Sequence, residues 1–229
     1  SLPGVERMSV DRLLAAVEGL ARIHHIWCQE SSWGPSPTVQ ERLQRLAGTQ
    51  QLLARQSEIA SRCQSERERQ LVAATCAALR DAGARLAQTL HQLRQIPLQI
   101  HFVQRDIWSD HLLFVGDELG GVIDFGAARV DEPLTDLVRM LSTCEPLRPE
   151  EVRWGWQQYL ATRKRLGDSL PPAGWTWERF RTLDRASTLL SAVQWMEWLT
   201  ISELEFQSPR EKLVDRWEKF ICRFSQFFG

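Results

Sequence analysis

The stretch from position 104 to 126, QRDIWSDHLLFVGDELGGVIDFG, constrains the fold of this chain most. Two apolar runs, LLFV and GVID, flank the loop GDELG, which has a glycine at each end and an aspartate beside the first glycine. A loop of this composition between two extended runs is typical of a β-hairpin. We predict a turn centred on Asp117 and Glu118.

The pairing within this hairpin brings acidic residues together. With that turn, Leu112 lies opposite Ile123 and His111 lies opposite Asp124, and a bulge would shift the register by one residue. Asp106 lies five residues before His111, at the end of the preceding strand. Two carboxylates beside a nitrogen or oxygen ligand suit a divalent cation and a bound phosphate, because the cation offsets the repulsion between the carboxylates. The pattern indicates a phosphoryl-transfer site.

Most of the remaining chain carries apolar residues at helical spacing. The predicted helices span 9–27 with Ser9 as N-cap, a segment that starts at Ser36-Pro37, 68–94, about 133–143, about 149–166, about 176–203, and a last segment that opens at Ser208. Between Gln56 and Arg69 the sequence is polar and charged. Besides the hairpin, only IPLQIHFV at 96–103 has the composition of a strand. The fold class is therefore mostly α (α+β), a helical body with one small β element near its middle.

Two of these helices have recognisable start signals. At Ser36-Pro37 the serine is a cap and the proline takes the first helical position. This helix is expected to bury Val39, Leu43, Leu46 and Leu53. At 208–211 the sequence SPRE predicts a capping box, with Ser208 as the cap and Glu211 at the third position.

Composition excludes several classes of function. Twenty-eight basic and 29 acidic residues give a net charge of −1, so no field of one sign favours nucleic acid or an anionic membrane surface. The five cysteines form no C-x-x-C pair and no disulfide framework, which favours a reducing cytoplasm. The longest apolar runs are far shorter than the roughly 20 residues that cross a bilayer. We expect no nucleic-acid partner and no membrane partner.

The segment resembles the catalytic loop and D-F-G motif of the protein-kinase-like superfamily, above all its branch of aminoglycoside phosphotransferases and choline-type kinases. That pattern is H-x-D-x-x-x-x-N, a short hairpin, and then D-F-G. Here Gln104, Asp106 and His111 stand at the three loop positions, and Asp124-Phe125-Gly126 follows thirteen residues later. The resemblance implies a single kinase-like C-terminal lobe over 1–229. It would have helices over 1–94, the strand, catalytic loop, hairpin and D-F-G over 98–126, and a helical subdomain over 127–229.

The same resemblance implies roles for individual residues. Asp106 resembles the catalytic base, and Asp124 resembles the main magnesium ligand. Asp136, in DEPLTDLVRML, resembles the buried aspartate that braces the catalytic loop. Leu113 and Ile123 occupy hairpin positions that lie under or beside the adenine ring in the family. ATP and Mg²⁺ are the implied cofactors, and a small-molecule hydroxyl is the implied acceptor.

Three departures from the family pattern matter. Gln104 replaces the initial histidine, and its amide can still brace the loop by hydrogen bonding. His111 replaces the asparagine that holds the second metal, so it is an altered ligand, with Mn²⁺ possible, or a phosphate contact, or a sign of weakened activity. Upstream of residue 104 there is no Gly-rich loop and no strand lysine, so an ATP-binding N-terminal lobe is expected from a longer chain.

Two functions follow, and some aromatic residues have open roles. The first hypothesis is an ATP-dependent phosphotransferase that acts on a small-molecule hydroxyl, with this chain as its catalytic and acceptor lobe. The second is a catalytically impaired, pseudokinase-type binding module. Trp108 is placed equally well to contact an acceptor or to fill the lobe surface. Trp195 and Trp198 are expected in the core, with Trp198 and Glu197 as remote candidates for an acceptor pocket.

Overall fold

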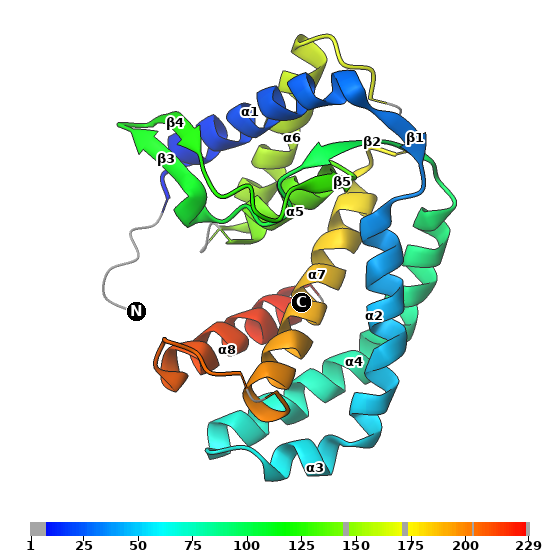
Figure 1. Cartoon of the computed structure of the whole chain (residues 1–229), viewed down its shortest axis with the longest axis vertical. Helices are drawn as coiled ribbons and strands as arrows, with labels where there is room; N and C mark the ends of the chain where they lie inside the picture. The colour runs from blue at the N-terminus through cyan, green and yellow to red at the C-terminus, as the bar shows by residue number, and fades with distance from the viewer. Residues whose placement is uncertain (1–7, 144–146, 171–173, 203, 228–229) are drawn as a thin grey trace. The chain divides into compact units, whose positions relative to one another are not determined.

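The computed structural model describes residues 8–143, 147–170, 174–202 and 204–227 (Figure 1). Helices form where the apolar periodicity predicts them: α1 Val10–Trp27, α2 Pro37–Ala54, α4 Glu66–Arg94, α5 Leu134–Thr143, α6 Pro149–Arg165, α7 Trp177–Thr200 and α8 Arg210–Gln226. A short helix that was not predicted, α3 Gln56–Ser61, lies in the polar stretch between α2 and α4. Two 3-10 turns, η1 Cys28–Glu30 and η2 Ser109–His111, complete the helical segments described. Position 203, the predicted end of α7, is outside the described residues.

The chain forms two compact units, each assembled from separate segments. The first unit consists of the described residues within Ser1–Thr38 and Gln95–Arg181, and the second of those within Val39–Arg94 and Thr182–Gly229. The quoted stretch from 104 to 126 belongs to the first unit.

Helix α1 provides much of the core of the first unit. Its N-cap is Ser9, as predicted, and the Ser9 side chain accepts a hydrogen bond from the backbone N–H of Arg12. The buried face consists of Leu13, Ala16, Val17, Leu20, Ala21 and His24. Gly155 of α6 permits close packing here, because a Cβ at Gly155 would lie 2.7 Å from Leu141 Cδ2 and 3.5 Å from Val17 Cγ2. The absence of a side chain at Gly155 therefore keeps α6 close to the other helices of this core.

A three-stranded antiparallel sheet crosses the first unit. It has the order β1-β2-β5, with β1 Ser32–Gly34, β2 Leu98–Val103 and β5 Arg129–Asp131. Strand β2 is the predicted strand, but β1 and β5 were missed. Each of them is three residues long, which is too short for a recognisable alternation of apolar and polar residues. Phe102 pairs with Val130, so β2 and β5 bring the start of the 104–126 stretch next to the segment that follows D-F-G.

The predicted hairpin is present, but its register was wrong. Strands β3 Leu112–Val115 and β4 Glu118–Val122 pair Leu112 with Val122, not with Ile123. The turn is therefore centred on positions 116 and 117, one residue earlier than predicted, and Gly116 adopts the left-handed conformation with φ +62°. A bulge lies between Leu113 and Phe114, which makes the pairing irregular.

The hairpin is fixed to the start of α1, beside which Figure 1 shows it. The Arg12 Nε donates to the Gly116 carbonyl at 3.0 Å and lies 3.2 Å from the Asp117 carboxylate. Leu119 of β4 packs onto Gly19, where an added Cβ would lie 2.2 Å from Leu119 Cδ2. The hairpin therefore has a defined position relative to the helical core of its unit.

The second unit is built mainly from helices, and two predictions made for it were wrong. In α2, Val39 and Leu46 are buried as predicted, but Leu52 is buried in place of Leu53, and Leu43 is only half-buried. Helix α8 begins at Arg210, and its N-cap is Pro209, whose side chain makes no capping hydrogen bond, so the capping box at Ser208 does not form. An ion pair fixes this helix start, because Arg210 Nε donates to the buried Glu68 of α4 at 2.8 Å.

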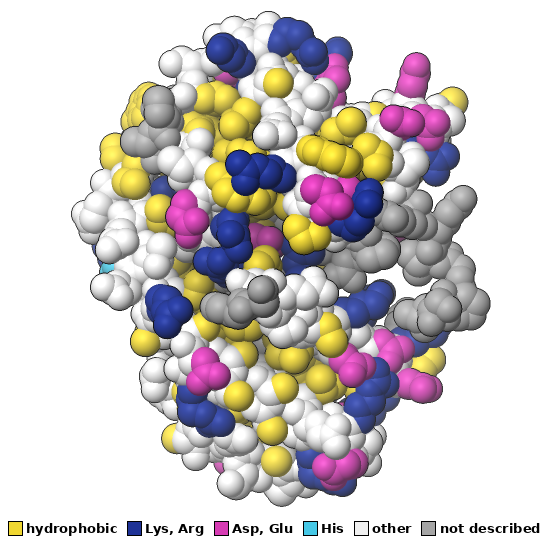
Figure 2. All heavy atoms as spheres, turned by 180° about the vertical axis from the view of Figure 1, so that it is seen from behind, with side chains coloured by type: hydrophobic (Ala, Val, Ile, Leu, Met, Phe, Trp, Pro, Cys, Tyr) yellow, Lys and Arg dark blue, Asp and Glu magenta, His cyan; other side chains and the backbone are white. Residues whose placement is uncertain are grey.

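The charged side chains on the surface are mixed in sign, in agreement with the net charge of −1 (Figure 2). On the face that Figure 2 shows, basic and acidic side chains lie interspersed with hydrophobic ones. Within the described residues, no helix is both long enough and apolar enough to span a bilayer.

Candidate functional site

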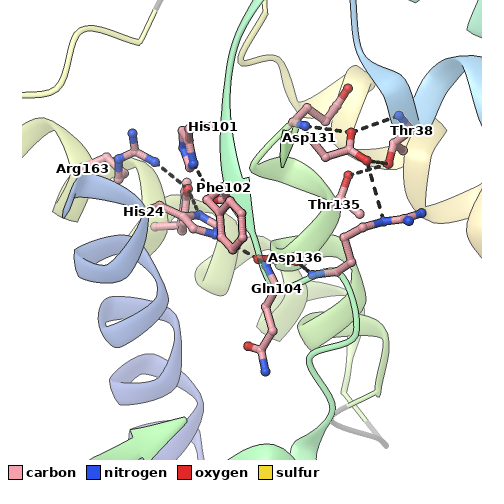
Figure 3. A network of polar contacts seen from close by, with 12 residues as sticks. His24, Thr38, His101, Phe102, Gln104, Asp131, Thr135, Asp136 and Arg163 are labelled. Atoms are coloured by element: carbon pink, nitrogen blue, oxygen red, sulfur yellow. Dashed lines mark hydrogen bonds and ion pairs between the residues drawn. The ribbon is translucent and has the colours of Figure 1, made fainter. Parts of the chain in front are cut away.

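A buried carboxylate in the first turn of α5 holds the loop that begins at Gln104. Asp136 is fully buried, and its Oδ2 accepts hydrogen bonds from the Gln104 N–H at 2.7 Å and from His24 Nε2 at 3.0 Å (Figure 3). Its Oδ1 accepts from the Arg105 N–H at 2.6 Å. A buried carboxylate needs such donors to offset its lost hydration. Asp136 therefore has the contacts expected of the residue that braces the loop.

His24 connects this brace to α6. Because burial lowers the pKa of His24, the imidazole is neutral and has one N–H, on Nε2, which donates to Asp136. Its Nδ1 then accepts from the Tyr159 hydroxyl at 2.6 Å, and that hydroxyl oxygen accepts from Arg163 Nη1 at 2.8 Å. Each donor in this buried chain has an acceptor, so the imidazole orientation is fixed.

Gln104 and Arg105 join the loop to neighbouring segments. The Gln104 side-chain amide donates to the carbonyls of Ile123 and Asp124, at 2.6 and 2.9 Å. An amide in place of the family's histidine thus braces the loop by hydrogen bonding, as the sequence suggested. Arg105 has a left-handed backbone with φ +68°, and its Nε lies 3.7 Å from the buried Asp131 carboxylate.

Asp106 has one carboxylate oxygen engaged. Oδ1 accepts from Trp108 Nε1 at 2.5 Å and from Arg139 Nη2 at 3.0 Å. The Asp106 side chain is 47% exposed, and among the described residues no donor reaches Oδ2. This carboxylate is therefore oriented, with its second oxygen accessible to a ligand.

Arg139 is the site residue that the sequence reasoning missed. Its guanidinium lies 3.9 Å from the centre of the Trp108 ring and pairs with Asp106. Burial lowers the pKa of Arg139, while the Asp106 carboxylate acts in the opposite direction. One signal could have revealed it, because Arg139 follows Asp136 by three residues and so lies on the same face of α5. Trp108 therefore contacts both side chains: its Nε1 donates to Asp106, and its ring packs against the Arg139 guanidinium.

His111 lies between the two aspartates of the motif. Its Nδ1 donates to the main-chain carbonyl of Asp106 at 2.9 Å, and its Nε2 is 3.7 Å from Asp124 Oδ2. In the neutral imidazole, this hydrogen bond requires the proton on Nδ1, so the lone pair is on Nε2, on the side of Asp124. The sequence placed His111 opposite Asp124, whereas the Ile123 N–H donates to the His111 carbonyl at 3.0 Å, so the backbone pairing is shifted by one residue.

Asp124 projects from a strained turn beyond β4. Its φ is +63°, and its side chain is 61% exposed. Oδ1 accepts from the Gly126 N–H at 3.3 Å, which leaves Oδ2 facing His111. Asp124 Oδ2 and His111 Nε2 are 3.7 Å apart, which is longer than a hydrogen bond. Together, the carboxylate oxygen and the imidazole nitrogen form a ligand set that fits a divalent cation. Manganese accepts such a mixed set more readily than magnesium does.

The other predicted site residues differ in their surroundings. Leu113 and Ile123 are 49% and 45% exposed, so both offer apolar surface at the hairpin.

In the second unit, Glu197 forms an ion pair with Arg45, and the Trp195 and Trp198 rings pack edge to face at 5.1 Å between centroids. Trp195 is buried, as expected.

Comparisons with known proteins agree with this architecture. The family described as "Phosphotransferase enzyme family" matches residues 6–181. A solved structure of a glucosamine kinase has a similar fold, with a TM-score of 0.54 and 14% sequence identity. The similarity covers 100% of this chain and 61% of the glucosamine kinase chain. Among curated proteins no sequence matches.

Proposed function

The chain belongs to the phosphotransferase enzyme family, and from this premise we propose that it takes part in ATP-dependent transfer of a γ-phosphoryl group to the hydroxyl of a small molecule. The proposal treats residues 1–229 as one lobe that supplies the catalytic residues and contacts the acceptor. The observation that carries it is the position of His111, which donates to the Asp106 carbonyl and lies 3.7 Å from the Asp124 carboxylate, on a loop braced by Asp136.

In this proposal Asp106 is the catalytic base. Its accessible Oδ2 orients the acceptor hydroxyl and accepts the proton, while Trp108 and Arg139 hold Oδ1. Such positioning supplies most of the catalysis in phosphoryl transfer, because the reaction itself requires little covalent chemistry from the protein. Arg139 and Trp108 are then positioning residues.

Asp124 and His111 would hold the divalent cation. The cation, when bound, neutralises the charge of the nucleotide phosphates. The Asp106 carbonyl fixes the His111 tautomer, so the ring can offer Nε2 as a ligand. We propose Mg²⁺ as the physiological ion and expect Mn²⁺ to bind at least as well.

The nucleotide would lie against Leu113 and Ile123. Their exposed apolar side chains suit the face of an adenine ring. Since this chain spans 61% of the glucosamine kinase chain, we propose that an N-terminal lobe of a longer protein covers the other side of the nucleotide. We propose a cytoplasmic location, because the described cysteines are free.

A non-catalytic binding module is the second candidate. It is favoured by the replacement of the family's metal-binding asparagine by His111 and by the ion pair that already engages Asp106. The two candidates differ in whether ATP is bound with a metal and consumed.

Calorimetry and turnover on the full-length protein test the proposal. We expect heat from ATP binding with Mg²⁺ or Mn²⁺, and ADP release in a screen of hydroxyl acceptors. Asp106→Asn should lower kcat about 10²- to 10⁴-fold while ATP still binds, as loss of a general base does. Asp124→Asn should weaken ATP binding in the presence of metal.

Asp81→Asn is the matched control, because Asp81 is an exposed aspartate of α4 outside the candidate site and its replacement should leave both measurements unchanged. Absence of binding heat with either metal would reject the enzyme hypothesis. Metal-dependent ATP binding without turnover of any acceptor would favour the binding module.

A further inference from the structure

A second cluster of metal-ligating side chains lies in the first unit, apart from the motif described above. One ligand atom from each of His25, Cys28 and Asp168 lies within 4.8 Å of the other two. His25 is at the end of α1, Cys28 begins η1, and Asp168 follows α6. None of these residues has a role in the proposed phosphoryl transfer.

The local backbone explains why these side chains meet. His25 and Cys28 are three residues apart at a helix end, so they lie on one face. Helix α6 ends in a Schellman motif, in which Gly167 is left-handed with φ +91°. The Gly167 N–H donates to the Lys164 carbonyl at 3.0 Å, and the Asp168 N–H to the Arg163 carbonyl at 3.1 Å. The motif turns Asp168 back toward α1.

The polar contacts of the cluster converge on one oxygen. Asp168 Oδ1 lies 2.8 Å from His25 Nδ1 and 3.5 Å from Cys28 Sγ. The Cys28 thiol also lies 3.0 Å from the His25 carbonyl. The second oxygen, Oδ2, accepts from Arg163 Nε in a buried ion pair.

Arg163 fixes the direction of the carboxylate. Its side chain is 1% exposed and donates to Tyr159 as well as to Asp168, so it is held at two points. Oδ2 is therefore engaged, and Oδ1 is the oxygen that faces the imidazole and the thiol. An outer partner that orients a carboxylate in this way is a common feature of metal sites. The guanidinium charge opposes a cation, so the affinity should be moderate.

From this geometry we propose that His25, Cys28 and Asp168 form a binding site for a dication of the zinc class. Sulfur, imidazole and carboxylate together select Zn²⁺ or Co²⁺ over Mg²⁺, which prefers oxygen. The His25 side chain is 30% exposed, which gives a route for solvent to supply the fourth ligand.

Titration of the reduced, chelator-treated full-length protein with Co²⁺ tests the site. We expect a thiolate-to-cobalt charge-transfer band that saturates at one equivalent and disappears when Zn²⁺ is added. Excess Mg²⁺ should leave the band unchanged. The Asp124 site contains no sulfur, so this band distinguishes the two cation sites, and an Asp124→Asn variant should retain it.

Variants assign the band to these residues. Cys28→Ser should abolish it, and His25→Gln and Asp168→Asn should each weaken Co²⁺ binding at least tenfold. Cys63→Ser is the matched control, because Cys63 is a partly buried free cysteine outside the cluster. If Cys28→Ser does not fold, the partly exposed His25→Gln variant decides the question. A band that is absent in the wild type, or that survives both Cys28→Ser and His25→Gln, would overturn the proposal.

Discussion

Asp136 should be the polar residue whose loss most destabilises the first unit. It is fully buried, and it accepts hydrogen bonds from the backbone N–H groups of Gln104 and Arg105 and from the His24 imidazole. We consider Asp136→Asn, which keeps the shape of the side chain, and Asp136→Ala, which removes it. Asp81→Asn, on an exposed position of α4, is the control.

The cost can be worked out from the three donors. In Asp136→Asn, the amide oxygen can keep the donors of Gln104 and His24, and the amide nitrogen then faces the Arg105 N–H. One buried donor without an acceptor costs about 1–3 kcal/mol, and two charge-assisted hydrogen bonds that become neutral lose about 1 kcal/mol each. The expected loss is about 3–5 kcal/mol. Asp136→Ala leaves all three donors without this acceptor and should cost about 5 kcal/mol or more.

Urea unfolding monitored by tryptophan fluorescence and by circular dichroism measures these losses. With a slope of about 1–3 kcal/mol per molar urea, the Asp136→Asn midpoint should fall by at least about 1 M. Asp81→Asn should change the free energy of unfolding by less than about 0.5 kcal/mol. If Asp136→Asn behaved like the control, the three hydrogen bonds would not hold the loop, and the bracing role of Asp136 would be rejected.

Two further predictions concern buried charge. Burial lowers the pKa of His24, and it lowers the pKa of His101 to about 3, so below pH 6.5 the unfolded chain takes up protons that the native protein excludes. The His101 contribution to stability should be fully present above pH 6.5 and should fall by about 1.4 kcal/mol per pH unit between pH 6.5 and 5, and His24 should act in the same direction. His101→Gln should reduce the slope of unfolding free energy against pH, and an unchanged slope would contradict the assignment. Arg179→Met should cost about 3–5 kcal/mol in urea unfolding, because it leaves the Glu132 carboxylate buried without its ion pair. The double variant Arg179→Met/Glu132→Leu should recover most of this loss, and a double variant as unstable as Arg179→Met would argue against an uncompensated charge as the cause.

The helices could be predicted because their apolar faces are long and regular. Helix α4 carries an apolar stripe along Glu66–Arg94, and that repeat is visible without any knowledge of its partners. The strands β1 and β5 could not be predicted, since each of these three-residue segments is extended only through its pairing with β2. At Ser208 a local capping signal was overridden by the ion pair between Arg210 and Glu68, which are distant in sequence.

For the candidate site, the sequence spacing predicted that Asp106, His111 and Asp124 approach one another, and the structure places His111 in contact with the Asp106 carbonyl and 3.7 Å from the Asp124 carboxylate. The contact of Asp106 with Arg139 was missed, because it depends on how α5 packs against the loop. The predicted hairpin register differs from the observed register by one residue. The observed register depends on the bulge between Leu113 and Phe114 and on the turn at Gly116, and the sequence is compatible with more than one position for each of them.

Backbone strain at the site is a further feature that the sequence pattern does not indicate. Among the residues that the structure describes, the non-glycine residues with positive φ are Arg105 and Asp124, which stand next to the proposed base and at the proposed metal ligand. Each such residue costs of order 1–3 kcal/mol and persists only where its surroundings hold it. Here Asp136 holds Arg105 through its N–H, and Gln104 holds Asp124 through its carbonyl. Pattern rules reserve this conformation for glycine, so they do not predict it at Arg105 and Asp124, where two buried polar braces, and not the residue's own preference, determine the direction of the chain.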